Sequence, residues 1–224
     1  NNDQFSFNTK FNIKDNSFQI VPLNYEKKED VNSIIIINGD FKKGNLLKFK
    51  TISLEENKNK ILINNLKLDN NFKVLDIEKA NINYKNKNKI LNKINLIKNN
   101  SNFIIEGDNL DLSKLIDNIM DSDDENSSIF ENLNSRVDIN IKKTYIDEIN
   151  HLNNLSGYII LKNNKINNLI LDADFPNDKN ISLTVLTNDA KETTTSLITD
   201  YPKPLIKRYK FIKGFEEGNL NFKS

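Results

Sequence analysis

Cysteine is absent from the 224-residue sequence, and so is tryptophan. The lack of cysteine excludes disulfide bonds, thiolate nucleophiles and soft-metal sites, and it fits either a cytoplasmic or a disulfide-free periplasmic protein. Histidine occurs once, at His151, so a Ser/His/Asp triad or a histidine-based metal site would depend on that residue alone. We expect His151 to be a solvent-exposed residue without a catalytic role, and we expect neither enzymatic activity nor a cofactor.

The sequence also lacks an excess of charge of one sign. It carries 32 Lys and Arg against 31 Asp and Glu, a formal net charge of +1, so no global field attracts nucleic acid. No apolar run reaches the length of a membrane span, and the first residues lack the basic and apolar blocks of a signal peptide. We interpret the chain as a piece of a longer protein whose export signal or membrane anchor lies upstream.

One acidic segment, 121–125, raises the question of calcium, because hard cations prefer clustered oxygen ligands. An EF-hand loop would place Gly and Glu where this chain has Asn126 and Asn132. A solvated acidic loop is therefore the favoured interpretation, and the sequence predicts no metal site.

What the sequence has in abundance is apolar alternation with a period of two, which is typical of strands with one dry and one wet face. It continues past a one-residue change of phase at 64–65, as a bulge or turn would give. Asn-rich and Pro-rich clusters at 38–40, 70–71, 86–88, 162–164 and 176–178 suit tight turns between antiparallel neighbours. The alternating residues are Phe5, Phe7, Phe11, Ile13, Ile61, Ile63, Leu66, Leu68, Ala80, Ile82, Tyr84, Val137, Ile139, Ile141, Leu169, Leu171, Ala173, Phe175, Ile181, Leu183 and Val185.

Two segments have helical spacing instead. One is near 111–121, with Asp111 as a possible N-cap, and the other is near 203–212, where apolar residues alternate with Lys and Arg. The second is basic enough to suit single-stranded nucleic acid or an anionic membrane surface. The balanced net charge and the helical phase favour a helix docked on a sheet, so we expect no nucleic-acid partner.

The predicted fold class is mainly β, an elongated antiparallel sheet with two short amphipathic helices. About a dozen strands at about 4.8 Å each would be too long to stay flat and uncovered. Two arrangements fit the alternation: a closed sandwich or barrel filled by its own side chains, and a curled half-pipe whose dry face remains available to an apolar ligand.

The order of motifs in the second half resembles a repeat of the AsmA-like proteins of Gram-negative bacteria. Segment 103–116, with a Gly-Asp pair, is similar to the repeat's opening, and 155–161 is similar to its hairpin around a Gly-x-Leu core. Asp200, the basic segment after it, Gly214 and Gly218 are similar to its close, although Tyr-Pro replaces a glycine after the aspartate. The resemblance divides the chain into a β-rich segment, 1–107, and a repeat, 108–224.

The resemblance implies a groove-shaped sheet in the periplasm that conducts phospholipid acyl chains between the inner and outer membranes and so supports outer-membrane biogenesis. The full-length protein would be anchored in the inner membrane. Apolar residues of one face would carry this function, without a discrete catalytic site. The candidate groove residues are Val137, Ile139, Ile141, Leu169, Leu171, Leu183 and Val185.

A second interpretation from a different class stays open. The same residues serve equally well as the core of a structural or adhesive β-scaffold whose interior is full and which binds no ligand. The sequence leaves the oligomeric state open as well.

Overall fold

The computed structural model describes residues 4–20, 23–42, 46–114, 132–209 and 217–224. Nearly all of its regular structure is β, as the alternation predicts. The strands are β1 (Gln4–Ile13), β2 (Phe18–Ile20), β3 (Tyr25–Lys27), β4 (Ser33–Lys42), β5 (Leu46–Glu56), β6 (Asn59–Leu68), β7 (Val74–Asp76), β8 (Lys79–Lys85), β9 (Leu91–Asn99), β10 (Asn102–Asp111), β11 (Ser135–Tyr145), β12 (His151–Lys162), β13 (Lys165–Asp174), β14 (Asn180–Thr187), β15 (Thr193–Thr199) and β16 (Leu220–Lys223), and the helix is α2 (Lys203–Tyr209).

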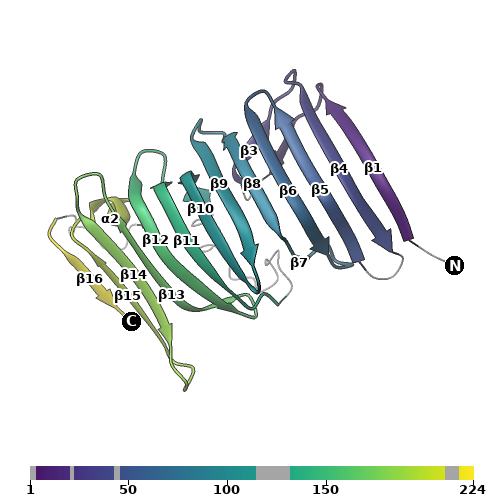
Figure 1. Ribbon diagram of the computed structural model, residues 1–224. Coiled ribbons are helices and arrows are strands. Elements are labelled where there is room, and N and C mark those ends of the chain that lie inside the picture. Colours follow the sequence, from purple (N-terminus) through teal and green to yellow (C-terminus); the bar gives the residue numbers. More distant parts are fainter. Residues whose placement is uncertain (1–3, 21–22, 43–45, 115–131, 210–216) are drawn as a thin grey trace.

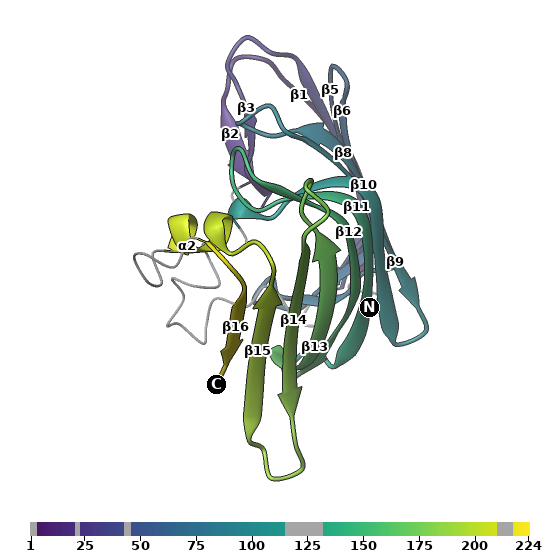
Figure 2. The same ribbon diagram turned by 90° about the vertical axis from the view of Figure 1, so that its left-hand side faces the viewer.

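One sheet of 14 strands contains every strand except β2 and β3, which form a separate two-stranded sheet. Along the main path the strands follow each other from β1 at one edge to β16 at the other, and β7 pairs with β6. The sheet does not close on itself. Figure 1 shows the strands side by side with the N- and C-termini at opposite ends, and Figure 2 shows the sheet curled around the side that carries β2, β3 and α2.

The expectation of a wholly antiparallel sheet is wrong at one position. β10 and β11 are parallel, with Phe103 opposite Val137 and Asp111 opposite Tyr145. Parallel neighbours require the chain to return along the length of a strand, which takes a dozen or more residues. Residues 112–134 provide that length. Every other pair in the path is antiparallel, and the segment boundary expected at residue 107 falls within β10.

The expectation of two amphipathic helices is not met either. The predicted N-cap Asp111 is the last residue of β10 and pairs with Tyr145, while residues 115–121 lie outside the described part. In the other segment α2 covers 203–209, and residues 210–212 lie outside the described part. Leu205 and Ile206, two adjacent residues of α2, are both buried. Pro204 is buried as well. Three consecutive residues span about 200° around a helix, so the buried surface of α2 is wider than a single stripe.

Most of the predicted turns are present, and Asn supplies much of the backbone geometry they need. Asn163 and Asn164 connect β12 to β13 with φ values of 50° and 65°, and Asp178 has a φ of 58° before β14. Short polar side chains tolerate this left-handed region, which other L-residues avoid. Two local predictions are wrong: 38–40 lies inside β4, and 155–161 lies within the single strand β12 instead of forming a hairpin.

The hairpin of β2 and β3 covers one part of the sheet. Tyr25 and Tyr84 form an edge-to-face pair with ring centroids 5.5 Å apart, and both pack with Leu54 and Ile61. The Tyr25 hydroxyl donates a hydrogen bond of 2.7 Å to the buried Glu56 carboxylate. Burial is the main reason why the pKa of Tyr25 is raised, and the Glu56 carboxylate adds to the shift. These contacts fix the hairpin to the dry face.

α2 covers a second part of the sheet, together with the segment before it. Leu205 packs in a buried cluster with Ile141, Leu155 and Phe175. The Phe175 ring also meets the Tyr201 ring edge to face at a centroid distance of 5.3 Å. The sheet is therefore covered by two small elements that share none of their buried residues. No helix among the described residues is both long enough and apolar enough to cross a membrane.

Candidate functional site

A continuous row of apolar side chains crosses the entire sheet on the face that α2 and the hairpin cover. Directly paired residues of neighbouring strands lie on the same face, so the strand registers trace the row residue by residue. We call this set the apolar row. From β1 to β16 its members are Thr9, Ile37, Ile52, Ile63, Ala80, Leu96, Ile105, Ile139, Gly157, Leu171, Leu183, Leu197 and Phe222.

The neighbouring rung on the opposite face has a different character. From β8 to β14 it consists of polar or charged residues only: Asn81, Asn95, Glu106, Asn140, Ser156, Asp172 and Ser182. Along this rung the face opposite the apolar row is polar from β8 to β14, although other rungs of that face contain apolar pairs such as Ile97 with Ile104. The apolar row contains no titratable side chain. Most of its members are half-buried; Ala80 is buried and Phe222 is exposed.

The structure brings all seven candidate residues to this dry face. Ile139, Leu171 and Leu183 belong to the apolar row itself. The adjacent rung on one side of the row contains Val137, Leu169 and Val185, with Ile159 of β12 between Val137 and Leu169. The adjacent rung on the other side contains Ile141, which pairs with Leu155.

Two of the seven differ from the rest in burial. Ile141 is 1% exposed and Leu169 is 5% exposed, and Ile141 belongs to the cluster beneath α2. They contribute to the core, while Val137, Ile139, Leu171, Leu183 and Val185 are half-buried. The role of these residues in holding a ligand stays a prediction.

Sequence reasoning assigned groove positions only in the second half of the chain and missed several members of the row in both halves. Leu96 and Ile105 join the two halves of the row, and Leu197 continues it toward β16. Ile37 and Ile52 extend it through β4 and β5. Alternation could have found Ile52, which lies between Thr51 and Ser53. The others each have an isoleucine neighbour on the opposite face, which hides the period of two.

Gly157 forms the one position of the row without a side chain. Its φ is +141°, and an added Cβ would lie 2.0 Å from the carbonyl oxygen of Ile170. Both the left-handed backbone and this close approach require glycine. No side chain therefore projects from the row at this position, between Ile139 of β11 and Leu171 of β13.

An ionic cluster lies on the face opposite the apolar row, where the register between β9 and β10 shifts. The Asp108 carboxylate accepts hydrogen bonds of 2.6 Å from Lys93 and 2.7 Å from Lys142. Hydrogen bonds from Lys142 and Lys93 lower the pKa of Asp108 to about 2. The register shifts between Gly107 and Asn109, so Asp108 is the extra residue of a β-bulge. Before the bulge the odd-numbered residues of β10 lie on the dry face. After it the even-numbered Leu110 packs against the cluster beneath α2.

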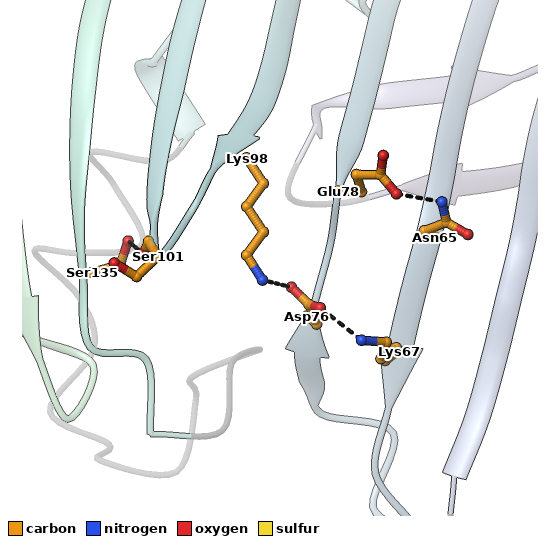
Figure 3. Close-up of polar contacts among 7 residues, drawn as sticks. All are labelled: Asn65, Lys67, Asp76, Glu78, Lys98, Ser101 and Ser135. Atoms are coloured by element: carbon orange, nitrogen blue, oxygen red, sulfur yellow. Dashed lines mark hydrogen bonds and ion pairs between the residues drawn. The ribbon is translucent and has the colours of Figure 1, made fainter.

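A second ionic cluster lies at the opposite ends of the strands, as Figure 3 shows. Asp76 of β7 accepts hydrogen bonds of 2.9 Å from Lys67 and 2.5 Å from Lys98. Burial alone would raise the pKa of Asp76, but the two ammonium groups outweigh it and lower the pKa. The register places Lys98 opposite Phe103, on the dry face. The Ser135 hydroxyl, in the same view, donates a hydrogen bond of 2.8 Å to the Ser101 carbonyl beside the parallel strand pair.

His151 is not the exposed residue that the sequence predicts. It is the first residue of β12 and half-buried, and its ring lies 5.5 Å from the Tyr145 ring. Burial lowers the pKa of His151, and the charge of Lys143 lowers it further. The described residues contain no group of three or more His, Cys, Asp or Glu that could hold a metal ion. The acidic segment 121–125 lies outside them.

Comparisons with family models, curated proteins and solved structures found no match to this chain.

Proposed function

We propose that this chain holds phospholipid acyl chains along its apolar row, as one segment of a periplasmic protein that conducts lipid between the inner and outer membranes. The observation that carries the proposal is the row itself, which runs without a charged residue from Ile37 on β4 to Phe222 on β16. The resemblance to the AsmA-like family supports the same function. The curled sheet would then act as a groove, with an upstream anchor in the inner membrane.

The dimensions of the row suit a lipid tail. Its span from β1 to β16 is about 58 Å at a strand spacing of about 4.8 Å. One leaflet of a bilayer has a hydrocarbon depth of roughly 15 Å, half of the core. Several acyl chains would therefore fit along the row. The interval at Gly157 leaves the row continuous, because Ile139 and Leu171 flank it.

The chemistry of the row also suits transport better than tight binding. Each buried methylene contributes about 0.8 kcal/mol whichever aliphatic side chain it meets. The neighbours Ile139, Ile105 and Leu96 present similar surfaces at successive strands. An acyl chain that moves by one strand exchanges equivalent contacts, so no position traps it.

The two covers leave room for such a ligand. The hairpin of β2 and β3 packs at Leu54 and Ile61, and α2 packs at Ile141. These residues belong to the next rung toward one end of the strands, beside the row. Leu96 and Leu183, both in the row, belong to neither buried cluster and are half-buried. Five members of the row, Ile63, Ile105, Ile139, Leu171 and Leu197, pack against the two buried clusters. Leu96 and Leu183 are therefore the row positions that we expect to receive an acyl chain.

The test measures transfer of a fluorescent phospholipid from donor vesicles to the purified chain, with native mass spectrometry of the product. Leu183→Asp and Leu96→Asp place a carboxylate in the row and should lower bound lipid at least about tenfold, because a charge is excluded from an apolar contact. The matched controls are Thr184→Asp and Asn95→Asp, which place the same group on the opposite face of the same strands. The controls should bind lipid like the parent chain.

Circular dichroism and thermal melting establish that each variant is folded before its lipid content is compared. A folded parent chain that takes up no phospholipid from vesicles would refute the proposal. It would favour the alternative, a structural or adhesive β-scaffold. Equal loss of lipid in the row variants and in their controls would likewise place binding outside the row.

A further inference from the structure

The two edges of the sheet differ in length and protection. β16 is four residues long, ends with Lys223 and forms one edge. β1 is ten residues long and forms the other, and no described strand pairs with its outer side. A long edge strand presents a row of unpaired N–H and C=O groups that can accept another strand. β1 is therefore the edge to consider as an interface.

β1 also lacks the devices that keep edge strands single. Its sequence contains no proline and no glycine, and Lys10 is its only charged residue. On the dry face Phe5 is 62% exposed and Phe11 is 48% exposed, and Phe41 of the adjacent strand is 42% exposed. Short length, charges, proline and bulges are the usual protection of an edge. Their absence here leaves both backbone groups and aromatic surface available.

We propose that β1 pairs antiparallel with β1 of a second copy of this chain, which joins the two sheets into one. Residues directly opposite each other in an antiparallel pair have the same hydrogen-bonding orientation and lie on the same face. In a two-fold symmetric pairing, odd residues of β1 can therefore meet only odd residues. The odd residues Phe5, Phe7, Thr9, Phe11 and Ile13 are those that pair with the dry face of β4 or continue it. Self-pairing thus makes the dry faces of both copies continuous.

Side-chain chemistry selects the register. With Thr9 on the two-fold axis, Phe7 lies opposite Phe11 of the second copy and Phe5 lies opposite its Ile13. Lys10 then lies opposite Asn8. If the two-fold axis passed through residue 10 instead of residue 9, Lys10 of one copy would lie opposite Lys10 of the other. Directly opposed like charges are destabilising. The register centred on Thr9 pairs apolar residues with apolar residues and separates the two ammonium groups.

This arrangement closes after two copies. A head-to-tail alternative, with β16 of one copy on β1 of the next, would produce an open filament. It would also pair at most the four residues of β16, which end in Lys223. The symmetric pairing uses most of the residues of β1 in each of the two copies. Because the pairing stands on the edge strand alone, it does not depend on the proposed lipid function.

The absence of cysteine from the sequence provides a direct test. In the Thr9→Cys variant the two sulfur-bearing residues would face each other across the axis, with Cα atoms about 4.5–5.5 Å apart. Disulfides form at Cα separations of about 4.4–6.8 Å. Mild oxidation should therefore give a covalent dimer with twice the 25.9 kDa mass of one chain. In Ser6→Cys the two cysteines would lie about 20 Å apart, and no dimer should form.

Sedimentation equilibrium of the unmodified chain supplies the second measurement, and it should show a dimer. Phe5→Lys should weaken the dimer roughly tenfold, because two contacts with Ile13 are lost per dimer. Phe72→Lys, a change at a 72% exposed turn residue, is the matched control and should leave the dimer unchanged. A chain that is monomeric at all concentrations would overturn the proposal. So would a disulfide between Thr9→Cys of one copy and Phe222→Cys of another, formed in place of the Thr9→Cys homodimer, because Phe222 lies on the same face as Thr9 and would report head-to-tail pairing.

Discussion

The two halves of the sheet have the same strand pattern on the dry face but different covers. In the N-terminal half a β-hairpin is fixed by aromatic rings and hydroxyl groups, with Tyr25 bonded to Glu56 and Tyr84 bonded to the Leu23 carbonyl. In the C-terminal half the short helix α2 and the segment before it bury apolar side chains, with Leu205 in the same cluster as Ile141. The hairpin is thus held by hydrogen bonds of buried tyrosine hydroxyls, whereas α2 is held by apolar burial and only the segment before it has a polar anchor, the Tyr201 N–H bond to the Thr199 hydroxyl.

The difference shows what each kind of cover contributes. Apolar burial is non-directional, so α2 gains stability without a fixed partner for each atom. A buried hydrogen bond adds little on average but costs much when one partner is removed. We therefore expect the C-terminal cover to be sensitive to side-chain volume and the N-terminal cover to be sensitive to single polar atoms.

The largest expected effect is that of Leu205→Ala. Removal of a buried leucine side chain from a packed cluster lowers the free energy of unfolding by about 2–5 kcal/mol, through lost burial and the cavity that remains. Chemical denaturation measures the change. Hydrogen exchange should show faster exchange in β11 to β13 and unchanged protection in β4 to β6, because the two buried clusters share no residue.

Lys207→Ala is the control for this prediction. Lys207 is exposed on the same short helix, so its removal should change the unfolding free energy by no more than about 0.5 kcal/mol. If Leu205→Ala opened both halves equally, the two covers would not be independent.

A smaller effect is expected for Tyr25→Phe. The change keeps the ring and its contact with Tyr84 but leaves the buried Glu56 carboxylate without one of its donors. The expected loss of unfolding free energy is about 1–3 kcal/mol, confined to the N-terminal half. Tyr158→Phe is the matched control, because its ring keeps the contact with the Arg136 guanidinium at 3.7 Å. Combined with Leu205→Ala, the two losses should add. A clear deviation from additivity would show that the halves are coupled.

The smallest effect concerns Asp108, at the bulge beside the parallel strand pair. Its pKa is lowered to about 2 in the folded state by Lys142 and Lys93, below the value of about 3.9 in an unfolded chain. Its contribution to stability is therefore present above about pH 4 and is lost as the pH falls through about 2. Asp108→Asn should remove this part of the acid dependence while leaving stability at neutral pH only slightly reduced. NMR titration of the Asp108 carboxyl carbon measures the pKa directly, and an ordinary value would contradict the prediction.

Much of the fold follows from the alternation, because burial on one face dictates which residues point inward. The strands around Phe7, Ile139 and Leu171 are where the pattern predicts them. The pattern also indicates the change of phase at Asn65, which has a φ of 50° in the middle of β6. The grouping of the candidate residues on one face follows from the same rule.

Other features could not be predicted because they depend on partners distant in sequence. Asp111 has the local signature of a helix cap, and its carboxylate accepts a hydrogen bond of 2.9 Å from the Ser113 N–H. Its second role, as the last residue of β10 opposite Tyr145, is not visible in the sequence. The parallel pairing of β10 with β11 depends on where the crossover places the chain, and alternation is identical in parallel and antiparallel strands. His151 has polar neighbours in the sequence, but it begins β12 opposite Tyr145 and is half-buried against that ring.

The open path of strands gives the molecule a freedom that closed folds lack. Each strand of the path touches only the strands on either side, so stability is close to a sum of nearest-neighbour contributions along one dimension. Insertion or loss of one hairpin, such as β13 with β14, would change the sheet by two strands. Because the sheet is open, no fixed number of strands is needed to close a barrel. Gene variation can therefore lengthen or shorten this protein in steps of a hairpin, and the distance it spans becomes an adjustable property of the chain.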